Sequence, residues 1–280
     1  MPEGDAAPDV RSACENWAGE TLEAWLNRVA GADAAVRRLR ETLTVMRRDG
    51  VDLGKRKGRG ELVEGLVRVE EVESFAAPFS FSEVFRGLLK GGSLHPGRYL
   101  LEVEERLHRG RAETSGAFSA GFLSRALRAF ASFLREVDFV RALEEVLGEE
   151  GDAAEVRLTG FVEDLEERAD LVVRHGGRWV RVWQYQSTPR GLEQVAVKLS
   201  EASRGRIPRG WHLLCPVDAR PGGDCADVFG WRLCSSEYAE SVREVLRGEG
   251  WVAHARLRKD LGSRPEVLAK PLLVRKGWWG

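Results

Sequence analysis

The chain has 280 residues, with 43 Lys plus Arg against 44 Asp plus Glu, a formal net charge of −1 and 43% apolar residues. These values exclude a disordered, fibrous or strongly polybasic protein, and they are typical of one large globular domain or a main domain with a smaller one. The basic residues comprise 36 Arg and 7 Lys, whereas the chain holds only 2 Asn and 3 Gln. Scarce amides with abundant charge are typical of a thermophile, and a GC-rich genome would also favour Arg over Lys.

No membrane or export signal is expected in this sequence. Its uninterrupted apolar stretches are shorter than the roughly 18 residues that span a bilayer. Its first residues lack the charged-then-apolar pattern of a signal peptide. We therefore expect a cytoplasmic protein without membrane contact, whose cysteines are buried, reduced thiols rather than a disulfide framework. The cysteines are Cys14, Cys215, Cys225 and Cys234.

The first part of the chain is predicted to be helical. Apolar residues recur at helical spacing over 10–48, which indicates a helical N-terminal segment over 1–60. The glycine-rich basic run at its end predicts an exposed loop or hinge. Residues 62–75 fit either a strand or a helix, and Ser82 followed by Glu83 predicts the start of a short helix.

The remainder, 61–280, is predicted to form an α/β domain with a core over about 119–234. Apolar residues at helical spacing predict one long helix, or two in series, before a switch to strand-like alternation. The elements expected in order are helix 119–150, strands 155–163, 169–174 and 179–186, a helix after Pro189, strands 211–217 and 228–234, a helix from Ser235 or Ser236, a possible strand 251–257 and a basic end. Three strands in a meander with helices before and after predict a mixed sheet flanked by helices.

One pair of predicted strands carries a family resemblance. Asp170 begins the apolar strand ADLVV, a Gly-Gly turn follows, and the next strand ends in Gln184-Tyr185-Gln186. This arrangement resembles the PD-(D/E)XK nuclease superfamily, especially its RecB-like branch, where an Asp at the head of one strand is followed across a hairpin by an acidic-X-Lys triplet. The resemblance implies a restriction-endonuclease-like fold and metal-dependent cleavage of DNA or RNA.

The resemblance also implies roles for individual residues. In the family, two carboxylates and a main-chain carbonyl bind Mg²⁺, while the Lys orients water and stabilises charge on the phosphate. Carried over, Asp170 is a metal ligand, the Tyr185 carbonyl is a second one, and Gln184 and Gln186 stand at the acidic and Lys positions. Because neither amide carries a charge, the triplet predicts weakened or lost catalysis and a binding or structural role.

Two alternatives remain open. An active Mg²⁺-dependent nuclease would need displaced partners: Lys198 on the following helix for the missing lysine, and Glu155 as a second metal ligand. Other acids in a position to replace the carboxylate are Glu144, Glu145, Glu163 and Asp164. In the other alternative the chain is a non-catalytic scaffold, with other protein subunits as its partners.

Nucleic acid is the partner that the resemblance implies. Arg174, Arg178 and Arg181 surround the predicted hairpin, and guanidinium groups bind phosphate through paired N–H donors. In the RecB-like branch the helix after the triplet carries Gln-X-X-X-Tyr, and here Gln194 is followed four residues later by Lys198. We therefore predict Gln194 and the three arginines as nucleic-acid-binding residues.

The cysteines allow a second cofactor hypothesis. Some branches of the resembling family hold an iron–sulfur cluster with one Cys before the core and three after it, and the cysteines here follow that order. The last three are separated by ten and nine residues, without the tight Cys-X-X-Cys pair typical of such clusters. Buried thiols are therefore the expectation.

Overall fold

The computed structural model divides into two compact units, which are described one at a time. One unit comprises Arg11–Phe133 and the other comprises Leu134–Gly280 together with Val10. The predicted boundary near residue 60 lies outside the described residues, and the two units divide within helix α8, Gly116–Gly148. The structure describes all residues except 1–9, 19, 30–33, 49–74, 76, 111–115, 149–154, 160–168, 202–208, 229–230, 249, 262–264 and 277–280.

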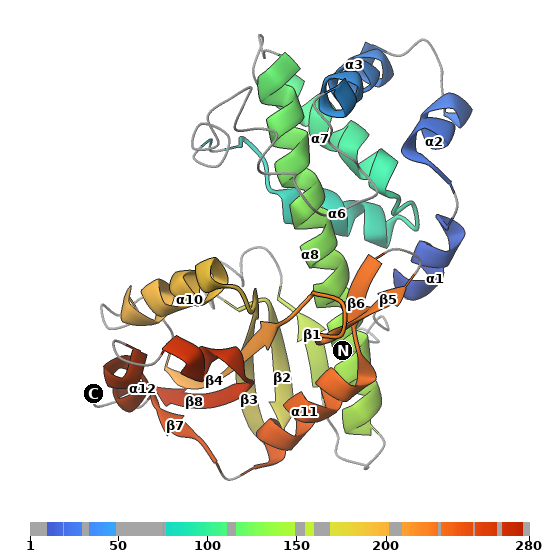
Figure 1. The fold of residues 1–280 in the computed structure, drawn as a ribbon. Helices are drawn as coiled ribbons and strands as arrows, with labels where there is room; N and C mark the ends of the chain where they lie inside the picture. The colour runs from blue at the N-terminus through green and yellow to red at the C-terminus, as the bar shows by residue number, and fades with distance from the viewer. Residues whose placement is uncertain are drawn as a thin grey trace. The chain divides into compact units, whose positions relative to one another are not determined.

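Helices build the described part of the first unit (Figure 1). They are α1 Val10–Asn16, α2 Leu22–Arg28, α3 Ala34–Arg48, α6 Phe81–Lys90, α7 Pro96–Gly110 and the first half of α8. The first three lie in the segment that was predicted to be helical. Buried aromatic rings fill the unit: Phe130 lies 5.4 Å from Phe85 and 5.0 Å from Tyr99, measured between ring centroids.

Two details of this unit differ from the prediction. Helix α7 was not predicted, and it begins at Pro96-Gly97, a pair that is typical of turns. Pro is compatible with the first turn of a helix, and a Cβ atom on Gly97 would lie 2.4 Å from the Trp25 ring, so glycine allows α7 to approach α2. Helix α6 begins at Phe81 with Ser80 at its N-cap, two residues before the predicted Ser82.

The second unit contains a six-stranded mixed sheet in the order β1-β2-β3-β4-β8-β7 (Figure 1). Strands β1, β2 and β3 form an antiparallel meander, β4 is parallel to β3, and β8 is antiparallel to β4 and parallel to β7. Gly176 and Gly177, both with positive φ, form the predicted two-residue turn between β2 and β3. The strands are β1 Glu155–Leu158, β2 Leu171–His175, β3 Arg178–Gln186, β4 Gly210–Val217, β7 Val252–Ala253 and β8 Leu272–Lys276.

Helices flank this sheet, as the sequence predicts. The second half of α8 and helix α11, Ser236–Arg247, contribute to one apolar core together with Val173, Val182 and Leu213 of the sheet. A second core joins Trp183 and Leu214 to α10 (Pro189–Glu201), α12 (His254–Leu261) and the 3₁₀ helix Pro265–Ala269. The unit is thus a mixed α/β structure with a mixed sheet between two layers of helices.

Three predictions for the C-terminal part were wrong. Residues 228–234 are not one strand: β5 Cys225–Val228 and β6 Trp231–Cys234 form a separate two-stranded sheet. The possible strand 251–257 is a two-residue strand, β7, followed by helix α12. The basic end contains strand β8, because the apolar run Leu272–Val274 pairs with β4 inside the sheet.

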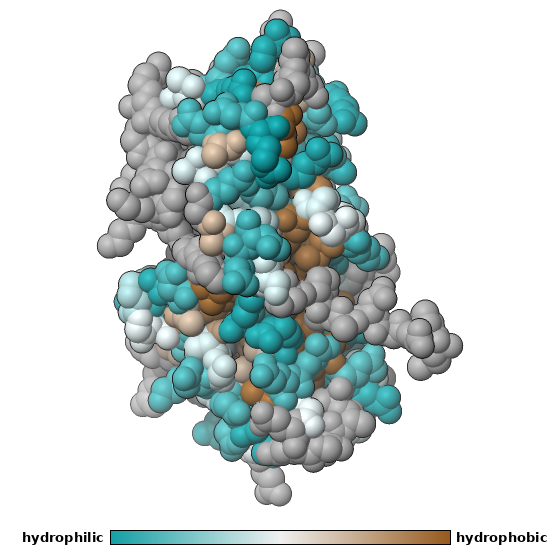
Figure 2. Space-filling model, turned by 90° about the vertical axis from the view of Figure 1, so that its right-hand side faces the viewer, coloured by the Kyte–Doolittle hydropathy of each residue, from teal (hydrophilic) through white to brown (hydrophobic). Residues whose placement is uncertain are grey.

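The surface agrees with the charged composition. On the face drawn in Figure 2, hydrophilic residues (teal) cover most of the described surface, and apolar residues (brown) form smaller areas between them. Among the described residues, no helix combines the length and the apolar character that crossing a membrane requires.

Helix α11 begins where the sequence predicts, because the Ser235 side chain accepts a hydrogen bond from the Tyr238 backbone N–H.

Candidate functional site

Asp170 is held at the head of β2 by its own backbone and side chain. Its N–H donates to the Val182 carbonyl at 3.0 Å, and its carbonyl accepts from the Thr159 N–H at 3.2 Å. Its carboxylate oxygen Oδ2 accepts a hydrogen bond of 2.6 Å from the backbone N–H of Gln184. The structure therefore brings Asp170 and Gln184 together, as the sequence predicts.

The triplet residues alternate across the sheet at the end of β3. Gln184 lies in line with Val180 and Val182 on the face covered by α8 and α11, and its Nε2 lies 3.5 Å from Cys234 Sγ. Tyr185 points to the opposite face, where its hydroxyl donates to the Leu268 carbonyl at 2.8 Å. Gln186 is exposed at the strand end.

Two charged residues beside this site were not singled out from the sequence. Asp138 and Arg135 lie in α8, and both are buried, Asp138 completely. The Cys234 thiol contacts the Arg135 carbonyl at 4.0 Å, and the Asp138 carboxylate acts electrostatically on the same thiol. The sequence shows only that an acidic residue stands within an apolar helical pattern; it does not show that this residue faces the core.

The environment of this site favours uncharged groups. Cys215, the register partner of Gln184 in β4, is fully buried, and burial raises the pKa of its thiol well above the usual range. Burial also raises the pKa values of the Tyr185 and Tyr238 hydroxyls. The thiols and phenols around Gln184 are therefore protonated and neutral at physiological pH.

The structure does not bring every predicted residue to this site. Glu155 pairs with Arg174 at the far end of β2, four positions or about 13 Å from Asp170 along the strand. The predicted metal pair of Asp170 and Glu155 is therefore not formed. Gln194 and Lys198 belong to helix α10, and their side chains lie outside the described residues.

The described residues do not fit a magnesium site. Within the described ranges, no three His, Cys, Asp or Glu side chains converge in a way that could bind a metal ion. Asp170 already directs one carboxylate oxygen to the Gln184 N–H. The four cysteines are buried as reduced thiols, and they include Cys225 and Cys234 side by side in the β5–β6 hairpin.

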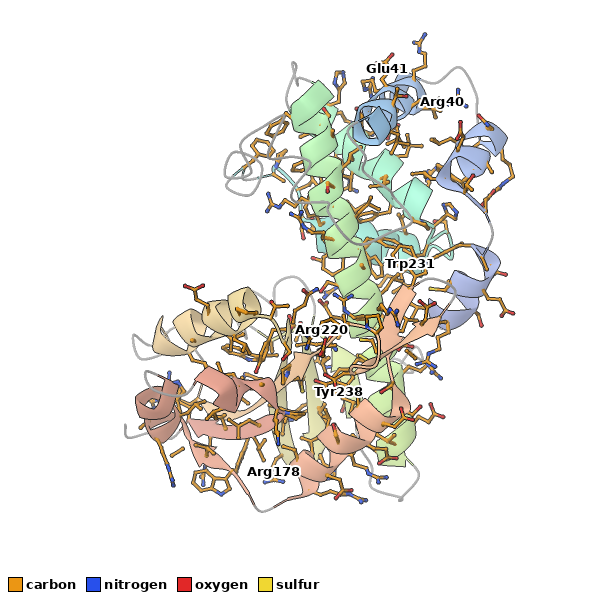
Figure 3. The ribbon with its side chains drawn as sticks, in the orientation of Figure 1. Arg40, Glu41, Arg178, Arg220, Trp231 and Tyr238 are labelled. Carbon is orange, nitrogen blue, oxygen red and sulfur yellow. The ribbon has the colours of Figure 1, made fainter. Side chains whose placement is uncertain are left out.

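The predicted arginines lie at the opposite end of the sheet. Arg174 is the next-to-last residue of β2, whereas Arg178 and Arg181 belong to the first half of β3, and Arg178 is labelled there in Figure 3. Gln184 lies six residues beyond Arg178 and three beyond Arg181, about 20 and 10 Å along β3, and the Arg181 guanidinium reaches the Arg209 carbonyl instead. The three arginines predicted to bind nucleic acid thus do not join the Asp170 site.

Arginine and tryptophan side chains meet at this other end, which we call the Arg–Trp edge: Arg157, Arg174, Arg178, Arg275, Trp179, Trp211 and Trp251. On one face, the guanidinium groups of Arg157 and Arg174 each lie 5.9 Å from the Trp179 ring. On the other, Arg178 and Arg275 lie 4.9 and 5.2 Å from the Trp211 ring. Such distances are typical of cation–π contacts.

Two of these rings remain accessible to a ligand. Trp179 and Trp251 are each 45% exposed, which is unusual for the largest apolar side chain. Trp251 lies 5.8 Å from Trp211 and 5.7 Å from the Arg275 guanidinium, so a partly buried ring and a cation hold it in place. The edge therefore presents fixed aromatic faces among positive charges.

Positive charge is concentrated beside the same edge. Lys276 follows Arg275 in β8 and pairs in register with Gly210, next to Arg209. Burial, together with the Arg209 charge, lowers the pKa of Lys276 below its usual value. The Arg181 guanidinium also lies here and donates to the Arg209 carbonyl at 3.1 Å. An anion bound at this edge would relieve repulsion among these cations.

Comparison of the chain with known protein families, with curated proteins and with solved structures finds no match.

Proposed function

We propose that the chain is a nuclease-like protein of DNA or RNA processing, with a restriction-endonuclease-like core, that binds nucleic acid and has weakened or lost catalysis. The hydrogen bond from the Gln184 N–H to the Asp170 carboxylate carries the proposal. It places an Asp at the head of β2 beside the triplet at the end of β3, the arrangement expected from the family resemblance. The order α8, β1, β2, β3, α10, β4, with β3 and β4 parallel, supports the same core.

The weakened catalysis follows from the missing charges. Gln184 offers a neutral amide, whose Nε2 contacts Cys234 Sγ, and Gln186 cannot supply the cation of a lysine. A single electrostatic group of this kind is worth about 10²–10³ in rate. Both the acid and the lysine are absent, and the described residues do not fit Mg²⁺, so we propose that this site does not support efficient hydrolysis.

A cleavage assay tests the catalytic part of the proposal. Labelled single- and double-stranded DNA and RNA would be incubated with the full chain and Mg²⁺ or Mn²⁺, alongside the Asp170→Asn variant. We expect no cleavage above background from either protein. Metal-dependent cleavage that is lost in Asp170→Asn would replace the proposal with the active nuclease that uses displaced partners.

Restoring the charges provides the complementary test. The double variant Gln184→Glu with Gln186→Lys places an acid and a lysine on either side of the Tyr185 carbonyl, next to Asp170. If the core is nuclease-like, we expect metal-dependent cleavage to appear, and adding Asp170→Asn to the double variant to abolish it. A folded double variant that neither cleaves nor binds Mn²⁺ would count against a nuclease ancestry of the site.

The Arg–Trp edge is the part of the described surface best suited to hold the nucleic acid. Arginine guanidinium groups pair with phosphates, and exposed indole rings stack on bases without sequence preference. Trp179 and Trp251 offer such rings, and Arg174 and Arg275 stand beside them. We therefore place binding here, about 20 Å from the triplet along β3.

Binding at the edge can be measured by fluorescence anisotropy with labelled oligonucleotides over a range of salt concentrations. The double variant Arg174→Gln with Arg275→Gln is expected to bind more weakly, with a salt slope smaller by about 2. The matched control, Arg106→Gln with Arg109→Gln, removes the same charge from α7 and should bind like the unmodified chain. Equal losses in both variants would show that the Arg–Trp edge is not the binding surface.

The same titration also tests the alternative in which the chain is a non-catalytic scaffold. A chain that neither cleaves nor binds any of the oligonucleotides, at low salt and while folded, would be assigned to the scaffold class. In that case the partners would be other protein subunits, and the Arg–Trp edge would be tested as a protein-binding surface.

A further inference from the structure

The β5–β6 hairpin places two cysteines directly opposite each other. Cys225 and Cys234 are register partners in this two-stranded antiparallel sheet. The next pair outward is hydrogen-bonded, since the Ser235 N–H donates to the Asp224 carbonyl at 2.9 Å. Hydrogen-bonded and non-hydrogen-bonded pairs alternate along an antiparallel ladder, so Cys225 and Cys234 form a non-hydrogen-bonded pair.

This position suits a disulfide. The Cα atoms of a non-hydrogen-bonded pair are about 4.5 Å apart, and their side chains approach each other more closely than in the hydrogen-bonded pairs. That separation lies within the range of about 4.4–6.8 Å over which disulfides form. The bond would therefore need little movement of the backbone of β5 or β6.

The two cysteines belong to one buried apolar core. Both cysteines are buried, and the Cys225 thiol is the first cause of the raised pKa of the Cys234 thiol. The Arg135 carbonyl and the Gln184 amide lie 4.0 and 3.5 Å from the Cys234 sulfur. Strand pairing and packing thus place the two side chains next to each other, and Cys234 adjoins the Asp170–Gln184 site.

A covalent link would add to the packing that stabilises this short hairpin. Each of its strands has four residues, and an isolated two-stranded hairpin of that length is marginally stable. The composition, poor in amides and rich in charge, is typical of thermophiles, and hyperthermophiles keep disulfides even in intracellular proteins.

We propose that Cys225 and Cys234 form a disulfide that closes the base of the β5–β6 hairpin when a low-molecular-weight disulfide is available as oxidant. Two thiol–disulfide exchanges make the bond: one cysteine attacks the oxidant and releases its first thiol, and the other cysteine then displaces the second. Two electrons and two protons pass from the cysteines to the oxidant, which leaves as two thiols. The proposal is independent of the nuclease-like function.

Peptide mapping tests this pairing. The full chain would be incubated with mixtures of oxidised and reduced glutathione, both as the folded protein and during refolding from denaturant, so that the burial of the thiols does not decide the result. After alkylation, trypsin cleaves at Arg209, Arg232 and Arg243. We expect peptide 210–232 linked to peptide 233–243 in the oxidising mixtures, and Cys14 alkylated throughout.

Cys215 requires its own control because it shares peptide 210–232 with Cys225. The linked peptides should persist in Cys215→Ala and disappear in Cys225→Ala. The oxidised chain should also unfold at a temperature several degrees higher than the reduced chain, and this difference should vanish in Cys234→Ala. Cys225 and Cys234 alkylated in every mixture, or a link that survives Cys225→Ala, would overturn the proposal.

Discussion

Strand β3 joins two ends of one sheet that differ in almost every physical property. At its start, the Arg–Trp edge is cationic and holds exposed aromatic rings such as Trp179. At its end, Gln184 and Asp170 hydrogen-bond to each other beside buried, neutral thiols. The end with the Asp170–Gln184 contact is therefore lined by buried, neutral thiols, whereas the opposite end is exposed and cationic. Substitutions at the two ends should separate stability from binding.

The largest effect is expected at Asp138, next to the site. Its carboxylate is fully buried and lies 3.9 Å from Arg141. Because Asp138→Ala removes a fully buried carboxylate and its interaction with the partly buried Arg141 guanidinium, we expect the free energy of unfolding to fall by about 3 kcal/mol. The control is Glu145→Ala, since Glu145 contacts the same arginine at 3.5 Å but is exposed, and its loss should cost about 0.5 kcal/mol or less. Equal losses in urea unfolding would contradict a buried role for Asp138.

A smaller loss of stability is expected from Asp170→Ala. This substitution leaves the Gln184 N–H without the acceptor it has at 2.6 Å, which should cost about 2 kcal/mol of unfolding free energy. Asp170→Asn keeps an acceptor oxygen and should lose less. Nucleic-acid affinity of the folded variants should remain unchanged, as measured by anisotropy. A loss of affinity in both variants, with stability preserved, would move binding to the Asp170 end.

The Asp170–Gln184 contact could be predicted from sequence, whereas the role of Asp138 could not. A two-residue turn at Gly176-Gly177 fixes the register of the hairpin, so position 170 must lie beside position 184. Asp138 lies in a helix with buried apolar residues on more than one face, such as Val137 and Phe139. Helical periodicity does not identify which polar residue of such a helix faces the core.

At the Arg–Trp edge, the main effect is expected on binding rather than on stability. Trp179→Ala removes an exposed ring, and the stacking of one base is worth about 1–3 kcal/mol, so affinity for single-stranded oligonucleotides should fall about tenfold. Trp179→Phe keeps an aromatic face and should retain most of the affinity. Urea unfolding of both variants should lie close to that of the unmodified chain. Unchanged binding by Trp179→Ala would remove stacking on this ring from the proposal.

Only part of this edge was accessible to sequence reasoning. Arg174 and Arg178 were predicted as binding residues because they flank a recognisable turn. Trp211 lies at this edge because β4 pairs in parallel with β3. Arg275 lies beside Trp211 because β8 pairs antiparallel with β4. Strand β8 had been interpreted as a basic chain end. Pairings between distant segments depend on the whole sheet, and local patterns do not encode them.

The smallest effect is a pH dependence of binding at Lys276. Burial and the Arg209 charge lower the pKa of this lysine in the folded chain. Just below the usual pKa of lysine, the unfolded chain therefore binds more protons than the folded chain. The free energy of unfolding consequently rises with pH in this range. A phosphate at the edge favours the charged form, so binding takes up a proton and affinity should fall as the pH rises from neutral towards the usual Lys value. The guanidinium of Lys276→Arg stays charged throughout this range, so its affinity should vary less with pH. Identical pH profiles of affinity for the two proteins would exclude Lys276 from contact with the nucleic acid and would confine the binding surface to the arginines and tryptophans of the edge.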